Sequence, residues 1–293
     1  MILSSIDIGS NAIRQLIVEV DSFGHFKVLK KHREMIRLGS DVFNYKRIQN
    51  ITERRLIAAF KRMARLNKKF LVEKSVAFAT SAFRDAQNKK PILSAIFRNS
   101  GVRIKVISGL KEAGLIRMAV QNTIGLNNDH CLLIDIGGGS VELTHLFNCR
   151  IYYSKSFKWG MVRMLTEALK VNVSAQALLK SKLRAADKKL PKAQFNLAIG
   201  TGGNMDAIAR LKLVLLRKGP NTLVTYDELL KMYKIFEKTP PAQRMQKMEL
   251  RADRVDVLEP AMFLTLHLMK KYKIKKLKIP GVGLKEGAIM SML

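Results

Sequence analysis

One motif occurs twice in the sequence, and this duplication constrains the fold more than any other feature. Ile6-Asp7-Ile8-Gly9 recurs as Ile134-Asp135-Ile136-Gly137, 128 residues further along the chain. Each copy ends an apolar strand in a carboxylate, turns on glycine and starts a second strand. We therefore expect two related α/β domains, over residues 1–125 and 126–293, facing each other across a cleft. The last helix could instead pack back on the first domain.

Hydrophobic periodicity and turn residues predict the remaining elements. A glycine turn at 200–203 follows a strand and opens a helix, and Thr225 with Glu228 forms a capping box at another helix. We expect strands over residues 1–8, 12–20, 26–38, 74–80, 102–108, 131–137, 140–147 and 150–157, and helices over 52–70, with Thr52 as its cap, 81–99, 110–124 and 250–271.

The three glycine turns indicate a phosphate-binding protein. Glycine at a strand end exposes backbone N–H groups without interference from a Cβ atom, and these groups bind phosphate oxygens. The two carboxylates that end the repeated strands, Asp7 and Asp135, are suited to hold Mg²⁺ together with water and phosphate. The alternative is that each aspartate caps its own turn. The candidate phosphate ligands in the turns are Gly9, Ser10, Asn11, Gly137, Gly138, Gly139, Ser140, Gly202 and Gly203.

The composition favours a polyanionic partner. The chain has 53 Lys and Arg against 23 Asp and Glu, a formal net charge of +30. Such an excess concentrates polyphosphates, nucleotides and nucleic acids near the surface, so we expect some nonspecific contact with nucleic acid. A dedicated nucleic-acid-binding module is disfavoured because zinc-finger spacing, stacking aromatics and a recognition-helix motif are all missing from the sequence.

Cysteine usage and the N-terminus indicate a cytoplasmic protein without membrane association. Cys131 and Cys149 lack metal-ligand spacing, and we interpret both as reduced thiols. The N-terminal residues lack a basic segment followed by an apolar one, and the apolar stretch 255–269 is interrupted by Asp256 and Glu259.

Seven motifs in order give the chain a specific resemblance. They are Asp7-Ile-Gly-Ser-Asn11 with Arg14, the run Thr80 to Asn88, Ser108-Gly109 with Glu112-Ala113, Asp135-Ile-Gly-Gly-Gly-Ser-Val-Glu142, Gly200-Thr-Gly-Gly203, Arg251-Ala-Asp253 and Gly283-Leu-Lys-Glu-Gly287. This order resembles the exopolyphosphatase/guanosine pentaphosphate phosphohydrolase family, in its short two-domain form.

The resemblance implies a fold, an activity and residue roles. The fold is that of the actin-like, acetate and sugar kinase superfamily, with a ribonuclease H-like core in each half. The activity is hydrolysis of the terminal phosphate of inorganic polyphosphate or of pppGpp with Mg²⁺ or Mn²⁺. Arg84 would clamp a phosphate, the alternative being an ion pair with Asp85 or another neighbour, while Asp135 and Glu142 would serve metal and water. A homodimer is a further option.

One departure from the family pattern leaves the activity open. Members usually carry Ser-Gly-x-Glu-Glu-Ala, and the first Glu of that pair is taken as the base that orients water; here that position is Lys111, followed by Glu112. Glu112 or Glu142 could supply the base, the chain could be a degenerate member that binds polyphosphate or guanosine polyphosphates as a sensor, or Lys111 could point to solvent with no consequence. An actin-like or sugar-kinase ATPase is a less favoured alternative.

Overall fold

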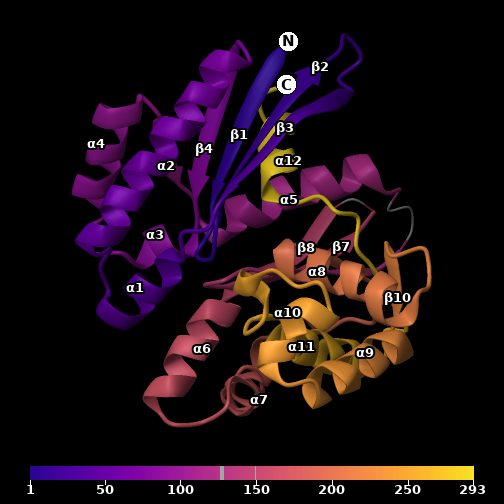
Figure 1. Cartoon of the computed structure of the whole chain (residues 1–293). Coiled ribbons are helices and arrows are strands. Elements are labelled where there is room, and N and C mark those ends of the chain that lie inside the picture. The colour runs from indigo at the N-terminus through magenta and orange to yellow at the C-terminus, as the bar shows by residue number, and fades with distance from the viewer. Residues whose placement is uncertain (126–128, 149) are drawn as a thin grey trace. The chain divides into compact units, whose positions relative to one another are not determined.

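The computed structural model describes residues 1–125, 129–148 and 150–293, so the predicted thiol Cys149 lies outside the described residues. The chain forms two compact units. Unit 1 consists of residues 1–119 with 283–293, and unit 2 of residues 120–282. Each unit contains one mixed β-sheet (Figure 1). The domain bounds expected from the sequence stay a prediction.

Unit 1 is a five-stranded sheet with helices packed on it. Strands β1 and β2 are buried along nearly their whole length, as expected for apolar strands covered on both faces. Leu3, Leu16, Val18 and Val20 of these strands form a core cluster with Ile289 of the last helix. The elements are β1 (Ile2–Ile8), β2 (Ile13–Val20), β3 (Phe26–Glu34), α1 (Leu38–Tyr45), α2 (Asn50–Lys69), β4 (Lys74–Ala79), α3 (Ser81–Asp85), α4 (Lys89–Ser100), β5 (Ile104–Val106), α5 (Gly109–Thr123, continuing into unit 2) and α12 (Leu284–Met290).

Unit 2 contains a six-stranded sheet. Its central strand β6 is buried at every position, and the predicted capping box of Thr225 and Glu228 begins α9. The elements are β6 (Cys131–Ile136), β7 (Val141–Phe147), β8 (Arg150–Phe157), α6 (Met161–Lys170), α7 (Ala175–Ala185), β9 (Leu197–Thr201), α8 (Gly203–Leu211), β10 (Leu223–Thr225), α9 (Tyr226–Lys238), α10 (Pro241–Lys247), α11 (Leu258–Lys271) and β11 (Lys276–Lys278), with short helical turns at Asp187–Lys189, Lys212–Leu216 and Ala252–Arg254.

The strand orders confirm the predicted duplication. The sheet of unit 1 has the order β3-β2-β1-β4-β5, and that of unit 2 has the order β10-β11-β9-β6-β7-β8. In each, the strand that carries the motif pairs antiparallel with the next strand in sequence and parallel with a later one: β1 with β2 and β4, β6 with β7 and β9. The two units are therefore α/β halves of the ribonuclease H-like type. Among the helices of the described ranges, none combines the length and apolarity needed to cross a membrane.

Candidate active site

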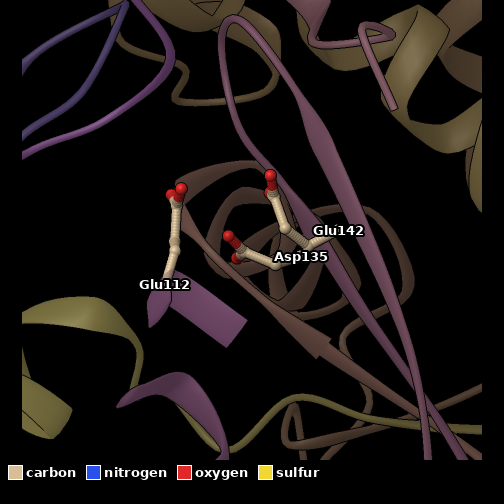
Figure 2. Close-up of side chains that lie close together, drawn as sticks. All are labelled: Glu112, Asp135 and Glu142. Atoms are coloured by element: carbon tan, nitrogen blue, oxygen red, sulfur yellow. The ribbon is translucent and has the colours of Figure 1, made fainter. Parts of the chain in front are cut away.

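A pair of buried carboxylates lies at the end of the central strand of unit 2. Asp135 on β6 and Glu142 on β7 are Cα partners across the antiparallel ladder, and they offer carboxylate oxygens within 4.8 Å of each other. Figure 2 shows the two side chains on their neighbouring strands. Because two anions so close together repel each other in a buried setting, this pair favours a bound cation.

Hydroxyl groups hold both carboxylates in place. Thr201 donates its Oγ1 hydrogen to Asp135 Oδ1 at 2.7 Å, and Ser156 donates its Oγ hydrogen to Glu142 Oε1 at 2.6 Å. Carboxylate oxygens in a polar setting are the ligands that Mg²⁺ and Mn²⁺ prefer in proteins. The residues present therefore fit the divalent cation expected from the sequence.

The glycine turn 137–140 that follows Asp135 presents its carbonyl groups to helix α6. Gly137 O accepts from Met161 N at 3.1 Å, Gly138 O accepts from Arg163 N at 3.0 Å, and Gly139 O accepts from Arg163 Nε at 2.7 Å. Arg163 is buried at 3% exposure, so its guanidinium is held beneath the turn.

This arrangement fixes where the N–H groups of the turn point. The bonds of the turn are trans, since the cis bond found in the described residues precedes Pro220. In a trans peptide unit the N–H points away from the C=O, so the N–H groups of Gly138, Gly139 and Ser140 face away from α6. Within the described residues, the N–H groups of Gly138 and Gly139 have no hydrogen-bond acceptor. N–H groups of a glycine turn that have no acceptor are suited to bind an anion.

A close approach between two glycines makes this docking of α6 possible. A Cβ atom added to Gly160, the residue before α6, would clash with the backbone of Gly139 and Ser140. Trp159, just before it, stacks on Phe157 with ring centroids 4.0 Å apart. The Gly160 position therefore requires glycine for steric reasons rather than for an unusual φ angle.

The third glycine turn lies next to Asp135. Gly202 has φ +86°, and a Cβ atom added to it would lie 2.8 Å from Asp135 Oδ1. Gly203 begins α8, and the next residue, Asn204, donates from Nδ2 to Ile136 O at 3.1 Å. Arg254 in turn donates from Nη1 to Asn204 Oδ1 at 2.7 Å. The turn thus closes around the Asp135 carboxylate.

In unit 1 the equivalent aspartate has a cationic partner. Asp7 on β1 is the Cα partner of Arg14 on β2, and the two form an ion pair at 3.3 Å. Burial raises the pKa of Asp7, and the charges of Arg14 and Lys285 oppose that rise. Arg14 already supplies a positive charge to the Asp7 carboxylate, so this aspartate does not need a metal ion to balance its charge. The role of Asp7 as a metal ligand stays a prediction.

The turn of unit 1 repeats the hydrogen bond found in unit 2. Gly9 N donates to Ala12 O at 3.2 Å, as Gly137 N donates to Ser140 O at 3.0 Å. Arg37 Nε donates to Asn11 Oδ1 at 3.1 Å, and this bond ties the turn to the segment before α1. The Ser10 hydroxyl is buried and has no hydrogen-bond partner among the residues that the structure describes. A phosphate oxygen would satisfy it.

At the start of α5 the side chains of Lys111 and Glu112 point in different directions. Glu112, which Figure 2 also draws, is buried at 7% exposure, and its Oε2 accepts from Arg84 Nη1 at 2.9 Å. Arg84 Nη1 also donates to Ile107 O at 3.0 Å. Lys111 is exposed, and its ammonium has no partner within the described part of the chain. Arg84 therefore positions Glu112, and Lys111 faces solvent.

Sequence reasoning missed several residues that build the site. Arg163, Asn204 and Arg254 were not among the candidates, although each is buried and polar. Thr201 and Ser156 were also missed. The available signal for Arg163 was a charged residue three positions after Gly160, but an isolated arginine in a helical pattern does not reveal that it is buried.

Comparison with known proteins shows the family of the chain. The Ppx/GppA phosphatase family matches residues 16–293 of the chain. Exopolyphosphatase 1 of Mycobacterium tuberculosis is 25% identical over 304 residues, covering 100% of this chain and 88% of that protein. The bifunctional 3-dehydroquinate synthase/phosphatase of Fusobacterium nucleatum is 34% identical over 148 residues, which cover 48% of this chain and 22% of that protein.

Solved structures share the fold over the whole chain. The exopolyphosphatase of Cytophaga hutchinsonii has a TM-score of 0.89 and 21% identity, covering 100% of this chain and 97% of that chain. The Ppx/GppA family member of Aquifex aeolicus has a TM-score of 0.81 and 23% identity, with coverage of 100% and 97%. The chain belongs to the Ppx/GppA phosphatase family.

Proposed function

We propose that this protein is a metal-dependent phosphohydrolase that releases the terminal phosphate of inorganic polyphosphate or of pppGpp. The observation that carries the proposal is the Asp135–Glu142 carboxylate pair next to the turn 137–140, whose N–H groups face away from α6. A cation site beside an anion site is what hydrolysis of a phosphoanhydride requires. The exopolyphosphatases among the relatives support the substrate class.

Asp135 and Glu142 would hold Mg²⁺ or Mn²⁺, which neutralises charge on the phosphate oxygens when it is bound. The N–H groups of the turn 137–140 would bind oxygens of the terminal phosphate and orient it. Ser10 and the turn 9–12 would bind phosphates further along the chain. The buried Ser10 hydroxyl, and the N–H groups of Gly138 and Gly139, for which the described residues offer no acceptor, support these roles.

Glu112 would be the residue that orients the attacking water. Water forms a bond to the terminal phosphorus, the P–O bond to the bridging oxygen breaks, and the proton of the water passes to the Glu112 carboxylate. Arg84 holds that carboxylate in a fixed direction. Lys111 has no part in this step.

The test measures phosphate release from polyphosphate and from pppGpp, and ADP formation from ATP with and without a sugar acceptor, each with Mg²⁺ or Mn²⁺. Release from polyphosphate or pppGpp, abolished by Asp135→Asn, supports the proposal and identifies the preferred substrate. Tight binding of either compound without release would instead support the alternative of a degenerate member that acts as a sensor. ATP turnover that depends on the sugar would contradict both. Whether the protein is cytoplasmic or dimeric stays a prediction.

A further inference from the structure

Helix α2 of unit 1 carries a continuous row of positive charge on one side. Its 20 residues contain Glu53 as the single acidic residue. At 3.6 residues per turn, its basic residues fall within an arc of about 140°, opposite the buried residues Leu56, Phe60 and Met63. We call this surface the α2 ridge; it consists of Arg54, Arg55, Lys61, Arg62, Arg65, Lys68 and Lys69.

Most of the ridge has no counter-charge from the protein. Arg62 is paired with Glu34, and Arg55 donates to Met35 O at 2.8 Å. The other five residues have no carboxylate partner within the described residues, and all five are exposed. Arg65 has like-charged neighbours three or four positions away on both sides, an arrangement that destabilises a helix. A polyanion bound along the ridge would relieve this repulsion.

The ridge begins close to the phosphate-binding turn of unit 1. Arg55, near its N-terminal end, contacts Met35, and two residues later Arg37 holds Asn11 of the turn. From Arg54 to Lys68 the helix rises about 21 Å. Cationic side chains therefore continue from the turn 9–12 along α2, all within unit 1.

We propose that the α2 ridge binds the distal part of an inorganic polyphosphate chain whose inner phosphates, next to the terminal one, lie at the turn 9–12. The inference rests on the proposed function for its substrate. Inorganic polyphosphate fits better than nucleic acid because the ridge offers charge alone: no aromatic side chain of α2 is exposed for base stacking. The ridge would raise affinity for long chains and leave short ones unaffected.

The test compares two variants with the same loss of charge. The ridge variant carries Arg54→Gln, Lys61→Gln, Arg65→Gln and Lys68→Gln. The control carries Lys180→Gln, Arg184→Gln, Lys188→Gln and Lys192→Gln, four exposed positions in unit 2. Binding of long-chain polyphosphate and of tripolyphosphate is measured without divalent cation, at low and high KCl. A duplex RNA serves as a third ligand.

We expect the ridge variant to bind long-chain polyphosphate roughly tenfold more weakly than the control does, with a shallower salt dependence and unchanged tripolyphosphate binding. An equal loss in both variants would overturn the proposal, since net charge alone would explain it. A loss confined to RNA would also overturn it. Binding is measured here without hydrolysis, so the proposal for the α2 ridge can be correct even if the wild type releases no phosphate. A wild type that releases no phosphate would count against the proposed function alone.

Discussion

Asp135 faces Glu142 across β6 and β7 at the position where, in unit 1, Asp7 faces Arg14 across β1 and β2. The two halves of the chain thus share a backbone register, but the residue opposite the aspartate is a cation in unit 1, Arg14, and an anion in unit 2, Glu142. In unit 1 the aspartate is paired with a cation at 3.3 Å. In unit 2 it lies next to a second carboxylate. This difference assigns the predicted metal site to unit 2 more strongly than to unit 1.

The substitution Glu142→Arg should therefore remove metal binding while keeping the fold, because it places in unit 2 the ion pair that Asp7 and Arg14 form in unit 1. Added Mg²⁺ should raise the Tm of the wild type by mass action and leave that of the variant unchanged. Glu237→Arg, at an exposed position of α9, is the control for the change in charge. A Tm rise with Mg²⁺ that persists in Glu142→Arg would contradict this assignment.

Arg163 should act as a positioning residue for the turn 137–140. Arg163→Met removes the hydrogen bond to Gly139 O, and a bond from a charged donor contributes about 1.5–3 kcal/mol. We expect KM for polyphosphate to rise roughly 10- to 150-fold with a smaller change in kcat, and Arg163→Lys to restore part of the affinity. Thermal unfolding of both variants separates this effect from a loss of stability. A lower Tm with unchanged KM would show that Arg163 is only structural.

Two glycines should respond to alanine in opposite directions. Gly160→Ala puts a Cβ atom against the backbone of Gly139, so we expect unfolding to become easier by about 1–3 kcal/mol. Gly114→Ala on α5 meets no atom within 4 Å and should stabilise the protein by about 0.4–1 kcal/mol. Urea unfolding measures both. Equal stability of the two variants would be inconsistent with the contact between Gly160 and Gly139.

Glu34 should contribute stability that depends on pH. Hydrogen bonds from Arg62 hold the pKa of Glu34 below its ordinary value of 4.5, with partial burial opposing them. A carboxyl group whose pKa is lower in the folded state stabilises the fold above its unfolded value and loses that contribution as the pH falls. The Tm difference between wild type and Glu34→Gln should be constant near neutral pH and shrink below pH 4.5. A difference that does not change with pH would contradict the Arg62 contact.

The sequence predicts those strands and helices that are specified by residues close together in the chain. The repeated Asp-Ile-Gly motif gave the right strand positions in both halves, because a buried strand ending in a glycine turn needs only neighbouring residues to specify it. The helix expected over 110–124 is α5, Gly109–Thr123. The capping box of Thr225 and Glu228 is also present. Each of these features is encoded within a few residues.

The expectations that failed involve contacts between distant residues. The helix expected over 81–99 is divided into α3 and α4, because Asn88 bonds to both backbone groups of Ile48. The helix expected from residue 250 begins at Leu258, since Asp253 and Arg254 are buried in a separate turn and Arg254 reaches Asn204. Such pairings cannot be read from hydrophobic periodicity.

Two further differences between prediction and structure concern the start of α2 and the presence of α1. Thr52 was expected to cap α2, but the helix begins at Asn50 after Gln49, and Thr52 is buried within the first turn. Helix α1, Leu38–Tyr45, was not expected at all. It is short, and its glycine and serine at positions 39 and 40 are poor signals for a helix. The sequence likewise leaves the outward orientation of Lys111 as one of three alternatives, because the rotation of a helix about its axis depends on tertiary packing.

In the proposed reaction Glu112, and not the residue at position 111, orients the attacking water. The most direct measurement is the rate of phosphate release from polyphosphate with Mg²⁺ for the wild type, Glu112→Gln and Lys111→Glu. We expect kcat to fall about 10²–10⁴-fold for Glu112→Gln, with substrate binding retained, and to change little for Lys111→Glu. An inactive wild type that gains activity from Lys111→Glu would contradict it.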